Sequence, residues 1–145
     1  MMAAGIDIIE ISRVQNTLNK FGDRFLKRVY TEPEITLYHG RVQDLAARFA
    51  AKEAVMKALG TGAKGVGWKD IEILPNHRGK PLAYLHGRGK KRANELGIKD
   101  LEVSLSHSKE LATAIAIATT HNESQENREE SRDLLLSLLK SNSSD

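Results

Sequence analysis

Residues 101–118 read LEVSLSHSKELATAIAIA. Apolar and polar residues alternate from Leu101 to His107, and after three polar residues an apolar run extends from Leu111 to Ala118. Alternation with a period of two is typical of a strand that buries one face, and a short polar break between two such runs predicts a hairpin. We therefore expect two antiparallel strands in this stretch.

The preceding sequence predicts a second hairpin, an N-terminal strand and several helices. Ile71–Leu74 and Pro81–Leu85 are expected to pair through the polar turn 76–80, and Ala4–Ile11 to form the first strand. Helix ends are marked by capping residues and glycines. We expect a capping box at Ser12 and Gln15, a second at Thr31 and Glu34, a helix that Asp44 caps and Gly60 ends, and a helix over Arg88–Leu96 that Gly97 ends. Hairpins with helices between them predict an α+β fold, with a mainly antiparallel sheet packed by helices.

The length of 145 residues corresponds to one domain. We place this domain at residues 1–120, because the chain becomes polar after Thr120. Residues 121–145 are expected to form a tail, to which we assign no function. Within it we predict disorder over residues 121–133 and a short helix over Leu134–Leu139.

The composition favours a cytoplasmic protein with no membrane span. The chain has no cysteine, which excludes a disulfide framework and a thiolate metal site and is typical of a reducing compartment. No apolar run approaches the ~18 residues of a membrane helix, and Met1–Ala4 lacks the basic flank of a signal peptide. The net charge is +3, with the basic excess in residues 1–120. This charge predicts an anionic partner, which could be nucleic acid, a phosphate-rich ligand or an acidic protein.

Two carboxylates lie in or beside predicted apolar faces. Asp7 lies in the middle of an isoleucine-rich strand, where an unpaired ion would cost on the order of several kcal/mol. It must meet a cation, face water or be protonated, and an ordinary salt bridge or a position at the sheet edge would also explain it. Glu53 lies at the rim of the apolar stripe of the helix 44–60, which consists of Leu45, Phe49, Met56 and Leu59.

Basic residues surround Glu53 on the same predicted helix. Lys52 falls inside the apolar stripe, and Arg48 and Lys57 lie about one turn to either side of Glu53. An i,i+4 pair between Glu53 and Lys57 would contribute about 0.2–0.5 kcal/mol, but it does not explain Lys52. A carboxylate flanked by bases suits a metal–phosphate site, in which the carboxylate holds a hard cation and the bases hold phosphate oxygens. Asp7 and Glu53 are therefore candidate ligands for Mg²⁺.

Other signals are weaker. His107 is expected on the inward side of its strand, where a core or turn histidine is more common than a functional one. The glycines of residues 60–67 could cradle a phosphate, but they lack the Walker pattern, so a plain loop explains them as well. Arg78–Pro81 is by itself an ordinary hairpin turn.

Taken together, these motifs resemble the holo-acyl-carrier-protein synthase family of phosphopantetheinyl transferases. The matching segments are Gly5–Ile11 with Arg13, Arg48–Ala54 with Lys57 and Ala58, Gly79–Pro81, and Ser104–Glu110. They follow the family's order and spacing over about residues 4–119, and FAAKEA at residues 49–54 is the most specific. One departure is Ala3-Ala4-Gly5, where the family more often has Gly-x-Gly. The resemblance implies the family's fold and its reaction, in which 4′-phosphopantetheine moves from coenzyme A to a serine of apo-acyl carrier protein and adenosine 3′,5′-bisphosphate leaves.

The resemblance also implies roles for individual residues. Asp7 and Glu53 match the acidic pair that holds Mg²⁺ with the pyrophosphate of coenzyme A. One of these carboxylates is expected to take the serine proton; Glu53, acting through a water, is the candidate, and the sequence leaves the choice between the two open. Lys57 matches the lysine that contacts phosphate and acts as general acid toward the leaving group. Positions that match the nucleotide part of the site are Arg48, Gly79, Lys80, Pro81 and His107.

Partners follow from the same resemblance. Arg13 matches the arginine that engages an acidic helix of the carrier protein, and Arg24 and Lys27 are expected to extend this patch. Family members resemble trimers with each active site between two subunits. A trimer would place Lys52 and the alanine-rich faces of its helix at a subunit contact.

Two other functions share part of this pattern. A basic nucleic-acid-binding module without catalysis would explain the charge, but the aromatic content is 5% and basic and aromatic residues do not interleave as in stacking platforms. A small Mg²⁺-dependent phosphohydrolase or nuclease would use Asp7 and Glu53, but it gives no reason for His107 and Gly79–Pro81 to accompany them.

Overall fold

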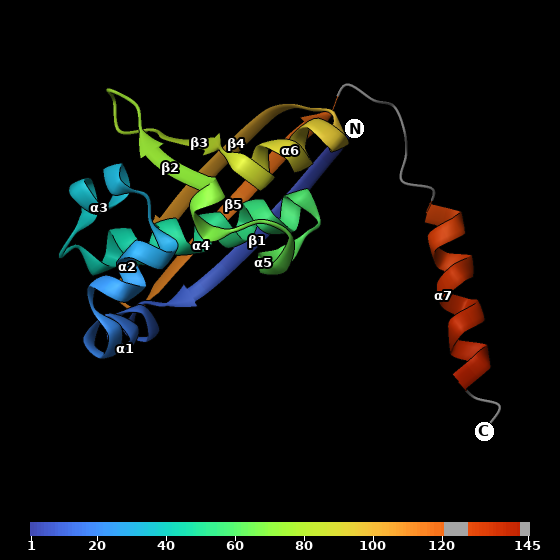
Figure 1. The fold of residues 1–145 in the computed structure, drawn as a ribbon, viewed down its shortest axis with the longest axis horizontal. Coiled ribbons are helices and arrows are strands. Elements are labelled where there is room, and N and C mark those ends of the chain that lie inside the picture. Colours follow the sequence, from blue (N-terminus) through green and yellow to red (C-terminus); the bar gives the residue numbers. More distant parts are fainter. Residues whose placement is uncertain (121–127, 143–145) are drawn as a thin grey trace.

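The computed structural model describes residues 1–120 and 128–142. Its strands form two antiparallel sheets, one of three strands in the order β1-β5-β4 and one of two strands, β2-β3 (Figure 1). The strands are β1 (Met2–Glu10), β2 (Ile71–Pro75), β3 (Pro81–Leu85), β4 (Ile98–His107) and β5 (Leu111–Thr120). Helices pack on these sheets, so the α+β fold predicted from the hairpin pattern is confirmed.

The larger sheet is built on the hairpin predicted from residues 101–118. β4 pairs with β5, with Val103 opposite Ala116, and β1 pairs with the other edge of β5, with Gly5 opposite Ala116. The alanines of β5 that point to one face are at most 2% exposed; they are Ala112, Ala114, Ala116 and Ala118. Because these side chains are small, a helix can approach this face of the sheet closely.

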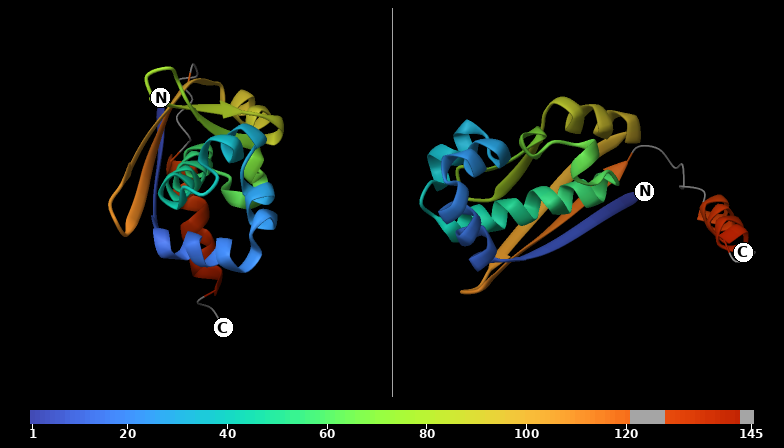
Figure 2. Two further views of the ribbon diagram at one scale, coloured as in Figure 1. Left: turned by 90° about the vertical axis from the view of Figure 1, so that its left-hand side faces the viewer. Right: turned by 60° about the horizontal axis from the view of Figure 1, so that its bottom comes forward.

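That helix is α4 (Val42–Leu59), which Figure 2 shows running along the three-stranded sheet, with β2 and β3 on its other side. Twelve of its 18 residues are buried, which is the pattern of a core helix rather than a surface helix. Ala50, Ala51 and Ala54 are 0% exposed within the single chain. The expectation that the alanine-rich faces lie at a subunit contact is therefore wrong, because the chain's own elements cover them.

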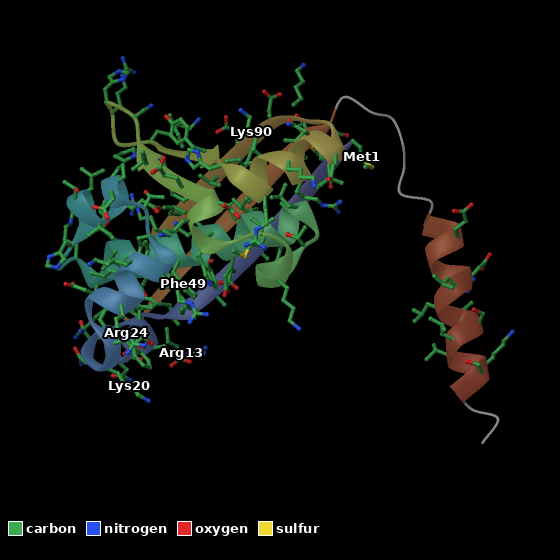
Figure 3. All side chains as sticks on the ribbon, in the orientation of Figure 1. Met1, Arg13, Lys20, Arg24, Phe49 and Lys90 are labelled. Atoms are coloured by element: carbon green, nitrogen blue, oxygen red, sulfur yellow. The ribbon has the colours of Figure 1, made fainter. Side chains whose placement is uncertain are left out.

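Several shorter helices surround this core: α1 (Ile11–Phe21), α2 (Asp23–Val29), α3 (Glu32–Tyr38), α5 (Gly62–Gly65), the 3₁₀ turn η1 (Trp68–Asp70), α6 (Gly87–Leu96) and α7 (Arg128–Asn142). The predicted capping box of α3 is present, with Thr31 N donating to Glu34 Oε1 at 2.8 Å. Gly60 and Gly97 end α4 and α6 in the left-handed conformation, as predicted. Basic side chains gather at the end of the molecule formed by α1 and α2, where Figure 3 places Arg13, Lys20 and Arg24.

Two predicted helix caps are wrong. Ser12 does not cap α1, because β1 continues directly into the helix and Ile11 is already helical. Asp44 does not cap α4 either, since this helix begins at Val42 and Asp44 lies in its first turn. An acidic residue in that position still favours the helix, because its charge complements the positive end of the helix dipole.

The C-terminal segment is more helical than predicted. Residues 121–127, part of the predicted disordered region, lie outside the described residues. Residues 128–133 were expected to be disordered, but α7 spans Arg128–Asn142, so this part of the prediction is wrong. Lys140 in the last turn complements the helix dipole, which the polar composition alone did not reveal. Among residues 1–120 and 128–142, no helix has the length and apolar character to cross a bilayer.

Candidate active site

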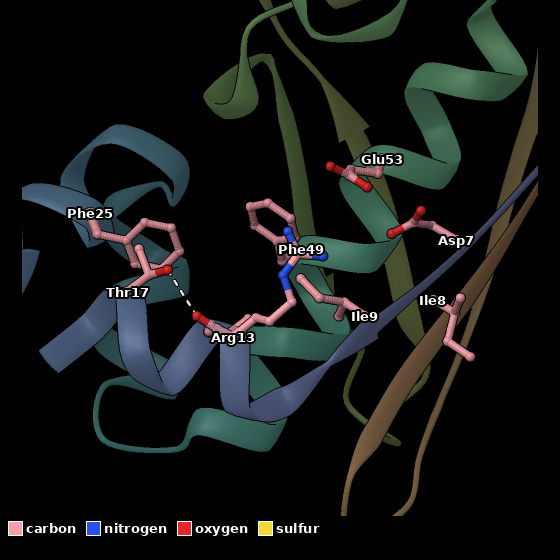
Figure 4. Close-up of a pocket in the computed structure, with 9 residues that line it drawn as sticks. Asp7, Ile8, Ile9, Arg13, Thr17, Phe25, Phe49 and Glu53 are labelled. Carbon is pink, nitrogen blue, oxygen red and sulfur yellow. Dashed lines mark hydrogen bonds between the residues drawn. The ribbon is translucent and has the colours of Figure 1, made fainter. Parts of the chain in front are cut away.

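Asp7 and Glu53 converge beside α4. Asp7 extends from β1 and Glu53 from the middle of α4, and Figure 4 shows their carboxyl groups pointing toward one another. Both line a cavity of about 180 Å³ to which β1, α1 and α4 contribute. The structure thus brings the two predicted metal ligands together within one chain, because β1 packs along α4.

Lys57 connects β1 and α4 at the corner formed by Asp7 and Glu53. Its ammonium donates to Ile6 O at 2.8 Å and to Asp7 Oδ1 at 3.2 Å. The Lys57 side chain is 55% exposed and that of Asp7 is 11% exposed. The second oxygen of Asp7, Oδ2, is buried and has no hydrogen-bond partner. A buried polar atom without a partner costs about 1–3 kcal/mol, so a cation, or a proton shared with the adjacent Glu53 carboxyl, would stabilise this oxygen.

The surroundings of the Glu53 carboxyl shift its pKa. Burial, followed by the adjacent Asp7 carboxyl, raises the pKa of Glu53 from 4.5 to about 7, although Lys57 and Arg13 act in the opposite direction. A divalent cation between the two carboxylates would satisfy Asp7 Oδ2 and offset the repulsion. No group of three or more His, Cys, Asp or Glu side chains suited to a metal occurs in the part of the chain that the structure describes. A pair of carboxylates fits Mg²⁺, which usually takes one or two from the protein and completes its shell with water and phosphate oxygens.

Arg13 and two aromatic rings complete the cavity. Arg13, on α1, lines it together with Phe25 and Phe49, so the predicted carrier-binding arginine lies beside the predicted metal ligands. The two phenylalanine ring centroids are 6.3 Å apart. Sequence reasoning missed these rings as cavity walls, because helical spacing indicates an apolar face but not where that face borders an opening.

A second cavity adjoins the first. It has a volume of about 320 Å³ and shares Thr17 and Phe25 with the cavity of Asp7. Its remaining lining residues are Phe21, Arg24 and Arg28. Arg24, predicted to bind the carrier, therefore lies next to Arg13 along one surface. Lys27 does not lie there, because it lines a different recess with Glu32 and His39.

Lys52 is part of a structural ion pair. It is 0% exposed, and its ammonium donates to Glu34 Oε1 at 2.7 Å, Ile71 O at 2.7 Å and Val29 O at 2.9 Å. Burial lowers the pKa of Lys52, although the adjacent Glu34 carboxylate acts in the opposite direction. The interpretation of Lys52 as a phosphate-binding base or as a residue at a subunit contact is therefore wrong. Its acceptors lie on segments distant in sequence, which spacing along the helix could not indicate.

Arg48 is also largely enclosed. Its guanidinium lies 4.0 Å from the centroid of the Tyr38 ring, and it donates to Tyr38 Oη at 2.9 Å and Asp44 Oδ1 at 3.3 Å. The residue is 9% exposed, and its Nε is buried without an acceptor. Arg48 does not line the cavity of Asp7 and Glu53, so its nucleotide-binding role stays a prediction.

The remaining predicted nucleotide-binding residues lie outside this cavity as well. Gly79 and Lys80 form the turn between β2 and β3, with Pro81 at the start of β3, and Lys80 Nζ pairs with Glu102 on β4 at 3.0 Å. His107 ends β4 opposite Ala112, on the same face as Val103, so the prediction that it lies on the inward side of the strand is confirmed, but the residue is exposed. At the strand end the alternation continues, but the core no longer covers it.

Comparison with known proteins supports one family. A family model described as the 4′-phosphopantetheinyl transferase superfamily matches residues 3–128. The holo-acyl-carrier-protein synthase of Herpetosiphon aurantiacus is 47% identical over 124 residues, which cover 81% of this chain and 98% of that protein. The corresponding synthase of Moorella thermoacetica is 48% identical over 120 residues, which cover 81% of this chain and 93% of that protein. The chain belongs to the holo-acyl-carrier-protein synthase family.

Solved structures of this family share the fold. The Helicobacter pylori holo-acyl-carrier-protein synthase in complex with coenzyme A superimposes with a TM-score of 0.74 at 32% identity, covering 80% of this chain and 99% of that one. The Bacillus anthracis synthase, in complex with coenzyme A (3′,5′-ADP), superimposes with a TM-score of 0.68 at 36% identity, covering 83% and 99%. The resemblance first indicated by the FAAKEA segment is thus confirmed.

Proposed function

We propose that this chain transfers 4′-phosphopantetheine from coenzyme A to a serine of apo-acyl carrier protein, with Mg²⁺ held by Asp7 and Glu53. The observation that carries the proposal is the corner where Asp7, Glu53 and Lys57 meet, with one buried carboxylate oxygen left without a partner. The synthase activity of the relatives and the coenzyme A in the Helicobacter pylori structure support the choice of substrates.

The carboxylates have distinct tasks in this mechanism. When bound, Mg²⁺ would supply positive charge to neutralise the pyrophosphate of coenzyme A. Asp7 is fixed by its hydrogen bond from Lys57 and presents its free oxygen Oδ2 as a ligand. Glu53 is the second ligand, and we assign it the proton of the carrier serine, taken through a water.

Lys57 faces the leaving group. Two of its three N–H donors are directed at Ile6 O and Asp7 Oδ1, which fixes the ammonium beside the Asp7 carboxylate. The third donor is available to a phosphate oxygen. Lys57 would offset the charge that develops on the departing adenosine 3′,5′-bisphosphate and would protonate it as general acid.

Carrier docking is assigned to the basic end of the molecule formed by α1 and α2. Arg13 lies in the cavity of the carboxylate pair and Arg24 lies in the adjoining one, so an acidic helix laid along them would bring its serine toward Asp7. Lys27 is kept in this proposal as a more distant contact, because it faces another recess. Nucleotide contacts are assigned to Arg48, Gly79, Lys80, Pro81 and His107.

The proposed assembly is a homotrimer with active sites between subunits. The face of the three-stranded sheet opposite α4 carries large exposed apolar side chains: Met2 74%, Ile6 63%, Ile8 63%, Ile115 39% and Ile117 40% exposed. Adjacent exposed apolar residues in such a set mark an interaction surface. A neighbouring copy on this face could contribute residues that lie outside the cavity in the single chain. The cytoplasm remains the proposed location, supported by the absence of cysteine.

A mass measurement tests the proposed reaction. The chain is incubated with apo-acyl carrier protein, coenzyme A and Mg²⁺, and the carrier is then weighed. The proposal predicts a gain of one phosphopantetheine group on the carrier, and the gain should disappear when EDTA replaces Mg²⁺. A carrier of unchanged mass would contradict the transferase assignment, and a full gain in EDTA would contradict the metal requirement.

A further inference from the structure

Gly5 lies at the closest approach between β1 and α4. A Cβ at this position would lie 1.9 Å from Ala54 O and 2.8 Å from Ala58 N. Both atoms belong to the helix backbone, so no side-chain rotation can relieve the clash. Gly5 is not among the glycines with positive φ. Space between the two elements, rather than an unusual backbone conformation, therefore requires glycine here.

This contact lies directly beside the carboxylate pair. Asp7 is two residues beyond Gly5 and therefore shares its face of β1. Ala54, whose carbonyl meets Gly5, is the neighbour of Glu53 in the chain. Lys57 closes the same contact by donating to Ile6 O at 2.8 Å. The distance of β1 from α4 at Gly5 thus fixes how far Asp7 stands from Glu53.

Both α4 and β1 are held in place by contacts on the sides that face away from Gly5. On the opposite side of α4, Lys52 is anchored by Glu34 and by carbonyl oxygens of three other segments, Val29 O, Ile71 O and Trp68 O, at 2.7–3.2 Å. On the outer side, β1 is paired along its length with β5, with Gly5 opposite Ala116. A side chain at position 5 would have to be accommodated between two fixed elements.

We propose that Gly5 is a positioning residue for the transfer reaction. It allows β1 to touch the backbone of α4 while Lys52 holds the helix from the other side, and this contact sets the separation of the Asp7 and Glu53 carboxyl groups. The consequence for cation binding rests on the proposed function, whereas the separation itself is a property of the chain alone.

Gly5→Ala tests this with two readouts. In a crystal structure of the metal-free variant, the two carboxyl groups should lie farther apart than in the metal-free unsubstituted chain. In calorimetric titration, Mg²⁺ affinity should fall by about 10–100-fold, the effect expected when the support of a ligand is removed. Gly67→Ala is the matched control, because a Cβ there meets only the side-chain ends of Arg88 and Asp70, both at 3.0 Å. This control should leave both readouts unchanged.

A second variant decides the matter if Gly5→Ala does not fold. Lys52→Met removes the opposing anchor and should also change the carboxyl separation and weaken Mg²⁺ binding. Ile73→Ala, a truncation of a fully buried residue on β2, provides a destabilised control in which Mg²⁺ binding persists.

The proposal is overturned if Gly5→Ala matches Gly67→Ala in both readouts, or if Lys52→Met cannot be distinguished from Ile73→Ala. A wild-type chain that binds no Mg²⁺ would defeat the proposed cation role instead. In that case the carboxyl separation in the variant structures alone decides whether Gly5 is a positioning residue.

Discussion

α4 carries two lysine–carboxylate pairs that differ in almost every physical respect. Lys52 and Glu34 meet at 2.7 Å with both side chains 0% exposed. Lys57 and Asp7 meet at 3.2 Å with side chains 55% and 11% exposed, and Asp7 Oδ2 has no partner. A buried pair surrounded by its own acceptors has no capacity left for a ligand, whereas an open pair with an unsatisfied oxygen has.

The difference should separate stability from activity along one helix. Removing one member of a buried pair leaves an uncompensated charge, at a cost of about 3–5 kcal/mol. An exposed pair contributes only about 0–1 kcal/mol to stability. We therefore expect substitutions at Lys52 to affect folding first, and the site only through the position of α4, whereas substitutions at Lys57 should affect the reaction with little change in stability.

The largest effect is expected from Glu53→Gln. Loss of the proposed proton acceptor and metal ligand should reduce the transfer rate by about 10²–10⁴-fold, while the unfolding temperature does not fall. The rate is measured from the mass of the carrier with time. Glu95→Gln on α6, which removes only a long contact with Arg92 at 3.8 Å, is the control. A fully active Glu53→Gln enzyme would remove Glu53 from the mechanism.

Lys52→Met should reduce the free energy of unfolding by about 3–5 kcal/mol, because Glu34 is left charged in the core. Lys57→Met should change it by no more than about 1 kcal/mol. Urea unfolding can be followed by the fluorescence of the single tryptophan, Trp68, which stacks on Phe49 with ring centroids 4.6 Å apart. Equal destabilisation by the two substitutions would remove the distinction between the pairs.

The open site should also make stability depend on pH when no divalent cation is present. The pKa of Glu53 is raised from 4.5 to about 7 in the folded chain by burial and then by Asp7. Since the folded state holds this proton more tightly than the unfolded state, stability from this group is lost as pH rises from about 4.5 through 7.

Melting curves in EDTA at pH 5 and pH 8 test this dependence. The wild type should lose more stability than Glu53→Gln on going to pH 8, and Mg²⁺ should restore part of the loss in the wild type. If the stability of the two proteins depends on pH in the same way, the pKa of Glu53 is not raised in the folded chain.

The smallest effect is expected at the basic surface. Arg24→Ala should weaken carrier binding by about fivefold or less, since an exposed ion pair contributes roughly 0.2–1 kcal/mol. The loss should shrink in 0.5 M salt because exposed charges are screened. Lys90→Ala on α6, away from the α1–α2 end in Figure 3, should leave carrier binding unchanged. An equal loss in both variants would indicate attraction by net charge rather than docking at Arg24.

The sequence predicted those features that depend on residues close together in the chain. The alternation in residues 101–118 gave the β4–β5 hairpin, and the glycines at 60 and 97 gave two helix ends. The strand-to-helix transition at Ser12 was missed, because β1 runs into α1 without the break that a capping residue normally marks.

The site was predicted in part. Asp7 was selected because it breaks a burial rule, and Glu53 because basic residues flank it on its helix. Their convergence was implied by the family resemblance before the structure placed them in one cavity. Lys52 breaks the same rule but for a different reason. Its partner Glu34 lies on another helix, and no spacing along α4 distinguishes a lysine that meets a buried carboxylate from one that meets a ligand.

Calorimetric titration of Mg²⁺ into the wild type, Asp7→Asn and Glu53→Gln at pH 8 tests most directly whether the two carboxylates share one cation. The account predicts one binding event per wild-type chain and its loss in either single variant, with Glu95→Gln binding as the wild type does. Mg²⁺ binding by Asp7→Asn or by Glu53→Gln with the affinity of the wild type would contradict it.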